Sequence, residues 1–380
     1  MELARRHFLV NVLAAPALSA VGKRRVQTVA FNYAGKSSPE DLHFFSRFDV
    51  LVTGGILSGD QRQLLRSSST RLVLYQWSSA YYPGDVVSAE SSWQEKVAAQ
   101  SHAWLLASGP VGGGAAASGK QALWYDFGNS DLTSARAEHI CQVVKDNGYQ
   151  GVFLDTLGFN ALPAELKQGF QKRHPGVNYD NCQGDFLAKL RHELGPDRII
   201  FTNQGYREPD VFLPHADFDL VENSSTFVND KGTTMFRPWF QKGAEWESIR
   251  VPMTNLVAPA QKRFPDTQFV QLNYADGDPL TCQRAVRYAF ACARLWNQAA
   301  FVATPSIQKP IRDNIYFTRL GEPSTPSYEE DVDAGAAWRR FQNGAVAVNT
   351  STKPYHVRAL RVDLTNPPKG YVFLGKRSPD

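Results

Sequence analysis

Two acidic residues each end a short, largely apolar run in this chain of 380 residues. Asp155 ends the run Gly-Val-Phe-Leu-Asp, and Glu222 ends the run Phe-Asp-Leu-Val-Glu. Runs with β-branched and aromatic members are typical of buried parallel strands. A carboxylate at the end of such a strand is costly unless it has a partner or a role. Two carboxylates on one face are the minimum that cleavage of a glycosidic bond requires.

Helix capping is the structural alternative for each of these two residues. An Asp after a strand often caps the next helix or forms a turn. For a single residue the two explanations are about equally good. Two carboxylates that end strands of the same polarity favour a shared site, because a (β/α)8 barrel delivers the C-terminal end of every strand to one face.

Strand-like and helix-like segments alternate along the chain, as in βα units around a parallel sheet. Strands are expected at residues 28–33, 50–53, 72–77, 151–155, 199–203, 220–222, 269–274 and 300–304, and helices at 134–147, 186–194 and 279–297. Residues 251–257 compete with 269–274 for the seventh strand. This pattern over residues 26–308 predicts an α/β fold, a (β/α)8 TIM barrel.

Two other segments depart from the simple alternation. Between the third and fourth strands, residues 103–107 and 122–127 look like extra strands joined by a Gly/Ala/Ser-rich stretch at 109–119, an elaboration of the active-site face. The stretch nearly matches a phosphate-binding loop, but Gln121 replaces the required Ser or Thr, so a nucleotide site is excluded. Residues 309–380 predict a short C-terminal β element, either a sheet packed on the barrel or a fragment of a β domain.

The N-terminus reads as a targeting segment. Arg5 and Arg6 precede a short apolar stretch and small residues, which predicts a signal peptide over residues 1–22 that resembles the twin-arginine type. The apolar stretch is shorter than the roughly 20 residues that a membrane span needs. We therefore expect a protein exported to the periplasm or the cell exterior, without stable membrane insertion.

Composition excludes several classes of partner. The 41 basic and 37 acidic residues are too balanced to indicate a nucleic-acid partner. The four cysteines form no C-x-x-C pair and no Cys/His spacing typical of zinc, so neither a metal nor another cofactor is expected, and a disulfide is not deducible from sequence. Aromatic residues make up 12% of the chain, which suits a carbohydrate ligand but also fills cores. A monomer is expected.

Polar and aromatic residues near the expected strand ends are candidates to bind substrate. They are Asn32, Tyr33, Gln76, Trp77, Asn203, Tyr206 and, in the elaborated segment, Asp126. Amides can bond sugar hydroxyls and rings can stack on sugars, although packing explains each residue about as well. Asn203 is favoured because a buried amide at a strand end needs a partner. Asp126 either serves the site or caps the following helix.

Several of these residues also carry a family resemblance. Residues 148–155, Gly-Tyr-Gln-Gly-Val-Phe-Leu-Asp, resemble the GYDGVFLD signature of the endo-α-1,4-polygalactosaminidases of glycoside hydrolase family 114 and of hypothetical glycosyl hydrolase-like family 15. Asn203 closing the fifth strand, Glu222 closing the sixth and the run at 340–349 are similar as well. The resemblance covers roughly residues 27–350. It implies a (β/α)8 glycosidase in which Asp155 and Glu222 match the proposed catalytic pair.

The resemblance also implies a substrate class. It points to an α-linked polysaccharide rich in amino sugars, with a partly deacetylated galactosaminoglycan as the first candidate. Such a polymer is cationic, so its cleft should carry carboxylates beyond the catalytic two. Asp126 and Asp131 are the available candidates.

Roles within the pair follow from the chemistry of hydrolysis, which needs one group to protonate the leaving oxygen and another to act at the anomeric carbon or on water. Glu222 has the longer arm and is expected to be the acid/base, and Asp155 the nucleophile, with the exchanged assignment left open. The sequence has no Gly-x-Ser-x-Gly or His-Glu-x-x-His motif for another hydrolase class. A catalytically inactive carbohydrate-binding barrel is the alternative, since a fold does not imply an activity.

Overall fold

A computed structural model describes residues 28–33, 37–81, 91–107, 122–305, 310–365 and 369–374. The predicted signal peptide at residues 1–22 lies outside these ranges. The Gly/Ala/Ser-rich stretch at 109–119 and Gln121 lie outside them too.

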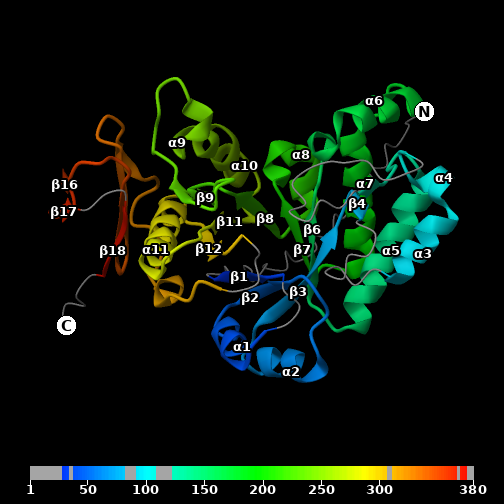
Figure 1. Ribbon diagram of the computed structural model, residues 1–380, viewed down its shortest axis with the longest axis horizontal. Coiled ribbons are helices and arrows are strands. Elements are labelled where there is room, and N and C mark those ends of the chain that lie inside the picture. The colour runs from blue at the N-terminus through cyan, green and yellow to red at the C-terminus, as the bar shows by residue number, and fades with distance from the viewer. Residues whose placement is uncertain are drawn as a thin grey trace, which may run out of the picture.

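Eight parallel strands form a sheet that is nearly closed into a barrel (Figure 1). In their order around the sheet they are β1 (Val29–Asn32), β2 (Val50–Thr53), β3 (Arg71–Trp77), β6 (Gly151–Asp155), β7 (Ile199–Asn203), β8 (Phe218–Glu222), β11 (Gln268–Tyr274) and β12 (Ala299–Ala303). The predicted TIM-barrel fold is confirmed, and each predicted strand end lies within two residues of the observed one.

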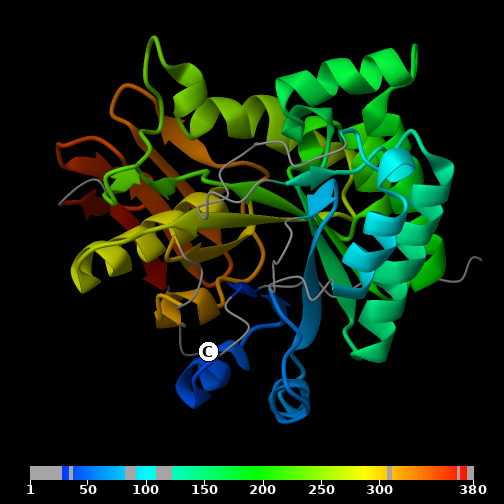
Figure 2. The same ribbon diagram turned by 45° about the vertical axis from the view of Figure 1, so that its right-hand side comes forward.

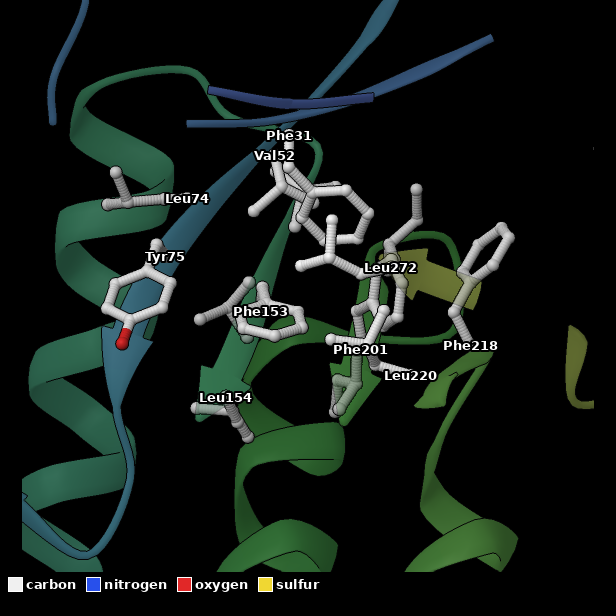
Figure 3. Packing of buried hydrophobic residues seen from close by; sticks show 14 of the residues in the cluster. Phe31, Val52, Leu74, Tyr75, Phe153, Leu154, Phe201, Phe218, Leu220 and Leu272 are labelled. Carbon is white, nitrogen blue, oxygen red and sulfur yellow. The ribbon is translucent and has the colours of Figure 1, made fainter. Parts of the chain in front are cut away.

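Aromatic side chains fill the interior of the barrel (Figure 3). The ring of Phe31 lies 5.9 Å from that of Phe153 and 5.8 Å from that of Phe201, measured between centroids. At the seam of the sheet, Phe31 also lies 6.1 Å from Phe301, which joins β1 to β12 through side-chain packing. Side chains alternate between the two faces of a strand. Each strand therefore presents every second side chain, these rings included, to the interior of the barrel.

Helices follow most strands and cover the outside of the sheet. They are α1 (Pro39–Phe45), α2 (Gly59–Ser67), α3 (Ser91–Ala99), α4 (Ser101–Trp104), α5 (Ser130–Asp146), α6 (Ala164–Arg173), α7 (Tyr179–Leu194), α8 (Pro209–Phe212), α9 (Arg250–Pro252), α10 (Ala258–Arg263) and α11 (Pro279–Leu295). Helix α5 begins earlier than predicted because the Asn129 side chain caps it, accepting from the backbone N–H groups of Asp131 and Leu132.

The competing assignment of residues 251–257 to a strand is wrong. The segment is helical and runs from α9 through a π-helical turn (Met253–Val257) into α10. Met253, Val257 and Ala260 are buried at helical spacing, whereas Leu256 is 36% exposed. A short apolar run has the same composition in a strand and in a helix, and only the helical periodicity of its burial separates the two.

The elaboration after β3 also differs in part from its prediction. Strand β4 (Ala80–Tyr81) pairs with β5 (Leu123–Trp124), so an extra strand does lie within residues 122–127. The extra strand expected at 103–107 is wrong, since Trp104 ends helix α4 and Leu105 contributes only an isolated bridge to Tyr125. After β8, a hairpin of β9 (Thr226–Val228) and β10 (Thr234–Phe236) extends the same end of the barrel.

The C-terminal element is a small sheet packed on the barrel. Its antiparallel strands are β13 (Glu329–Asp331), β14 (Ala336–Phe341), β15 (Gly344–Asn349) and β18 (Lys369–Leu374), beside a hairpin of β16 (Tyr355–Val357) and β17 (Val362–Leu364). A turn at residues 358–361 separates β16 from β17. Tyr288 of α11 shares a hydrophobic cluster with Val346 and Val348, and the orange and red strands lie against yellow α11 in Figure 2.

Two further findings concern membrane-spanning helices and the cysteines. None of the helices in the described ranges is both long and apolar enough to span a membrane. All four cysteines are free thiols in the structure, so the disulfide that the sequence left open is absent from it.

Gly151 provides a test of how closely β6 and β7 approach. A Cβ atom at this position would lie 2.3 Å from the Ile199 carbonyl oxygen. We expect Gly151→Ala to lower the free energy of unfolding by about 1–3 kcal/mol, as overpacking does elsewhere. Gly169→Ala in α6 is the control, because nothing lies within 4 Å of its added Cβ, and it should stabilise by about 0.5–1 kcal/mol. Denaturant unfolding measures both, and a wild-type midpoint for Gly151→Ala would contradict this packing.

Candidate active site

Three neighbouring strands end in polar side chains that meet at one point. Asp155, Asn203 and Glu222 close β6, β7 and β8, which are adjacent in the sheet. The Asn203 amide Nδ2 donates to Asp155 Oδ1 at 2.8 Å and to Glu222 Oε2 at 3.3 Å. Because both bonds share one nitrogen, the two accepting oxygens are separated by no more than the sum of the lengths, about 6.1 Å. The two predicted carboxylates therefore share one site.

Each carboxylate also accepts a hydrogen bond from its own tyrosine. Tyr75 on β3 donates to Asp155 Oδ2 at 2.6 Å, and Tyr274 at the end of β11 donates to Glu222 Oε1 at 2.6 Å. The backbone N–H of Thr156 completes the set on Asp155, donating to Oδ1 at 2.7 Å. These donors hold both carboxylates in fixed orientations.

Tyr75 and Tyr274 are not among the candidates predicted from the sequence, although strand alternation carries a signal for Tyr75. In the β3–β6 register, Trp77 pairs with Asp155 and Tyr75 pairs with Phe153. Tyr75 therefore shares a face with Trp77 and Asp155, whereas the adjacent residue points to the other face. Tyr274 closes a predicted strand, but its contact with Glu222 depends on how the strands align.

Burial and charge set the electrostatics of the pair. Burial raises the pKa of Glu222 above its usual range, and the nearby Asp155 charge raises it further. Hydrogen bonds from Tyr274 and Asn203 oppose that rise. Burial also raises the pKa of Tyr33 well above its ordinary value, with additional contributions from Asp155 and Glu222. A carboxyl group whose pKa is raised can hold its proton at a pH where an ordinary carboxyl group is ionised.

The backbone turns sharply directly after each of the three site residues. Thr156, Gln204 and Asn223 adopt left-handed conformations with φ of 59°, 59° and 56°. Such angles are uncommon outside glycine, and for the β-branched Thr156 they are a genuine outlier. Strain of this kind concentrates at functional sites, where the surrounding structure enforces it. Here it coincides with the points at which the chain leaves the barrel.

Buried Asp219, inside the predicted apolar run of β8, anchors the loop that follows Asn203. Its carboxylate accepts from Thr202 Oγ1 at 2.7 Å and from the backbone N–H groups of Gly205 and Tyr206 at 2.8 and 2.9 Å. Burial raises the pKa of Asp219 to about 7, opposed by these bonds. Asp219 therefore positions the loop and not the two carboxylates of the pair. The sequence alone did not distinguish this buried residue from an Asp on the solvent-facing side of a strand.

The other predicted binding residues are divided between the site and the surrounding scaffold. Tyr33 lies beside the pair, with its ring centroid 4.7 Å from that of Tyr75, and Trp77 packs edge-on against Tyr75 at 5.3 Å. Tyr206 is buried in the loop held by Asp219. These three placements leave the predicted sugar contacts as predictions.

Two of the predicted amides point away from the carboxylates. Buried Gln76 lies near Arg136 of α5, whose Nη2 is 3.5 Å from Gln76 Oε1. Asn32 donates to Ser37 Oγ at 2.6 Å. Strand alternation places both side chains on the face opposite the barrel interior, so neither lies with the two carboxylates, and their predicted contacts with substrate stay predictions.

Asp126 is committed to an ion-pair cluster. The carboxylate is 1% exposed, and it binds Arg173 Nη1 at 2.7 Å and His174 Nε2 at 2.8 Å, with the Gly128 N–H at 3.1 Å. This arrangement fastens the end of α6 to the elaborated segment. The predicted contact between Asp126 and substrate is therefore replaced by a structural role, because the carboxylate has no accessible face for a ligand.

A metal centre has no basis in the described part of the chain. There, no group of three or more His, Cys, Asp or Glu side chains gathers closely enough to hold an ion.

The raised pKa of Glu222 predicts a pH-dependent stability. The stabilisation associated with protonated Glu222 is complete below its unfolded pKa of about 4.5 and is lost as pH rises through the higher folded value. Gln does not ionise, so Glu222→Gln should gain stability relative to the wild type between pH 4 and pH 7.5. Thermal unfolding at both pH values measures the difference.

Asp278, the cap of α11, is the control of opposite sign. Hydrogen bonds from Thr281 lower the pKa of Asp278, so Asp278→Asn should lose stability relative to the wild type over the same rise in pH. If the stability of Glu222→Gln relative to the wild type fell as the pH rose, the folded site would favour ionised Glu222.

Comparisons with known proteins support the fold. No family model and no curated protein sequence matches the chain. Among solved structures, the glycoside hydrolase domain of PelA from Pseudomonas aeruginosa, in two forms, aligns with a TM-score of 0.54 and 20% identity over 75% of this chain and 97% of that one. An α-amylase from Geobacillus thermoleovorans aligns at 0.47 and 9%, over 88% and 90%. At such identities the likeness to the PelA domain establishes a shared barrel fold, and the second alignment adds no argument.

Proposed function

We propose that the protein is a glycoside hydrolase that cleaves a polysaccharide, with Asp155 and Glu222 as its catalytic carboxylates. The observation that carries the proposal is the Asn203 amide between them, which holds two acidic groups at adjacent strand ends of a TIM barrel. Catalytic groups of such barrels come from these strand ends. The fold likeness to the PelA glycoside hydrolase domain is consistent with this proposal.

The electrostatics support the division of roles inferred from the sequence. Glu222, whose pKa is raised by burial and by Asp155, is suited to donate a proton to the leaving oxygen. Asp155 is fixed by Tyr75, Asn203 and the Thr156 N–H, which suits a nucleophile. Attack of Asp155 on the anomeric carbon forms a glycosyl ester while the glycosidic bond breaks. Glu222 then takes a proton from the water that hydrolyses this ester.

The separation of the carboxylates supports retention of anomeric configuration. Asp155 Oδ1 and Glu222 Oε2, the two oxygens that share the Asn203 amide, lie at most about 6.1 Å apart, and this close approach favours the roughly 5–5.5 Å separation of retaining enzymes. Asn203 Oδ1 is buried without a hydrogen-bond partner among the described residues.

The substrate suggested by resemblance is a galactosamine-containing polysaccharide, and the charges around the site bear on its form. Of the two carboxylates expected to receive ammonium groups, Asp126 is bound by Arg173 and His174, and Asp131 is exposed on the first turn of α5. A polymer without free ammonium groups, such as an N-acetylated one, fits this arrangement better than a cationic polymer.

Removing either carboxylate tests the proposed mechanism. We expect Asp155→Asn and Glu222→Gln each to lower turnover by at least about 100-fold while the fold is kept, because each removes a group that acts in the transition state. Reducing ends released from a polysaccharide panel measure the activity, and NMR of the first-formed anomer tests retention. Asp131→Asn is the control and should keep wild-type activity.

Near wild-type turnover in either variant would refute the assignment of the pair. Binding of glycans without cleavage of any of them would instead favour the inactive carbohydrate-binding barrel.

Export is part of the proposal and rests on residues 1–22 alone. If the twin-arginine route is used, changing Arg5 and Arg6 to Lys should block translocation, whereas export by the general secretory route needs only positive charge and tolerates the change. Fractionation of the producing cells followed by N-terminal sequencing measures the outcome. A mature protein that starts at Met1 would contradict both routes.

A further inference from the structure

A small pocket of about 240 Å³ opens beside Glu222. It is lined by Asn223, Phe227, Val228, Arg237, Tyr274 and Pro305. Two of these residues connect it to the pair, since Asn223 directly follows Glu222 and Tyr274 donates its hydroxyl to Glu222 Oε1. A group bound in this pocket would therefore lie next to the carboxylate proposed to protonate the leaving oxygen.

Arg237 is the charged wall of the pocket, and its orientation is fixed. Its Nε donates to the Asn223 carbonyl at 2.8 Å and its Nη1 to the Glu247 carbonyl at 2.9 Å. Its guanidinium lies over the Phe227 ring, 4.6 Å from the centroid. Two carbonyls and one ring therefore hold the planar group without neutralising its charge, and its remaining N–H donors stay available.

The charge of Arg237 has no carboxylate partner in the described part of the chain. Other half-buried arginines are paired there, for example Arg191 with Asp217 and Arg250 with Glu330. Glu247 accepts the Arg237 hydrogen bond through its backbone oxygen, and its exposed carboxylate acts on the Arg237 charge through space without forming an ion pair with it. A guanidinium stays protonated in proteins, and burial lowers the Arg237 pKa more than the exposed Glu247 charge raises it, so an incoming anion would stabilise this partly buried cation.

We propose that this pocket binds an anionic substituent, a carboxylate or a sulfate ester, on a sugar unit next to the cleaved bond, and that Arg237 selects for it. The inference rests on the proposed function, because that function defines which bond is next to the pocket. The planar fork of a guanidinium matches the paired oxygens of such groups. An ammonium group of a deacetylated amino sugar would be repelled from the same position.

Equilibrium binding tests the proposal without relying on turnover. Asp155→Asn protein, in which Glu222, Tyr274 and the pocket are unchanged, is titrated by calorimetry with matched pairs of oligosaccharides. Each pair is an acidic oligomer and its carboxyl-reduced form, or a sulfated oligomer and its desulfated form, with oligogalactosamine as the cationic probe. We expect the anionic member of at least one pair to bind about 10- to 100-fold more tightly, the range for one charged hydrogen-bonded pair.

Two substitutions at Arg237 assign that preference to its charge. Arg237→Gln should remove the preference, and Arg237→Lys should keep part of it because the charge remains without the fork. Arg284→Gln is the matched control, since Arg284 also stacks on an aromatic ring, 4.4 Å from the centroid of Phe236, but does not line the pocket. If Arg237→Gln unfolds, the wild-type pocket still reports through the matched oligosaccharides.

Equal affinity within every pair, tighter binding of oligogalactosamine, or an anionic preference that survives Arg237→Gln would overturn the proposal. These results leave the catalytic pair untouched, because loss of hydrolysis in the Asp155 and Glu222 variants is measured separately. Conversely, a protein that binds acidic sugars through Arg237 but cleaves none of them would refute hydrolysis and keep the pocket.

Discussion

The hydrogen bond network centred on the Asn203 amide is the constraint on which the site depends. Two carboxylates about 6 Å apart repel each other by about 3 kcal/mol at an effective dielectric constant of 20. One amide nitrogen that donates to both Asp155 and Glu222 reduces this cost and fixes their separation. Tyr75 and Tyr274 act from the outer sides, so each carboxylate is held between two strands. The same hydrogen-bond network thus accounts for the short distance between Asp155 and Glu222 and for the difference between their surroundings.

The barrel supplies the rigidity that this network needs. Aromatic packing between Phe31, Phe153 and Phe201 fills the interior and sets the spacing of the strands. At the strand ends the chain bends through left-handed residues, and Asp219 ties the loop after Asn203 back to β8. Backbone strain and a buried carboxylate both cost stability, and they persist because the packed barrel enforces them.

The charged residues that surround the two carboxylates are not the ones that the sequence suggested. Asp126 looks available in the sequence, but Arg173 and His174 bury its charge in a structural cluster. Nothing in the sequence singles out Arg237, yet it lines the pocket beside Glu222 and forms no ion pair with a carboxylate of the described ranges. The two residues show that the charge a site presents depends on which side chains the fold brings together.

The sequence by itself determined the barrel and the positions of its two acids. Short apolar runs alternating with helical segments identified all eight strands, and a carboxylate at the end of two of them marked Asp155 and Glu222. Those signals are local, because strand propensity and the cost of burying a charge depend on a few adjacent residues. Residues 251–257 show the limit of such signals, since a short apolar run fits a helix and a strand equally well.

Only the tertiary structure decided which side chains act together. Tyr75 and Tyr274 are 80 and 52 residues away from the carboxylates they bind. Asp126 is bound by Arg173 at the end of α6, and the chain after the β9–β10 hairpin places Arg237 at the pocket beside Glu222. These outcomes depend on strand register, tilt and barrel closure, which bring distant positions within 3 Å of each other or keep them apart. These atoms become neighbours only when the barrel closes, so no local pattern in the sequence encodes the distance between them.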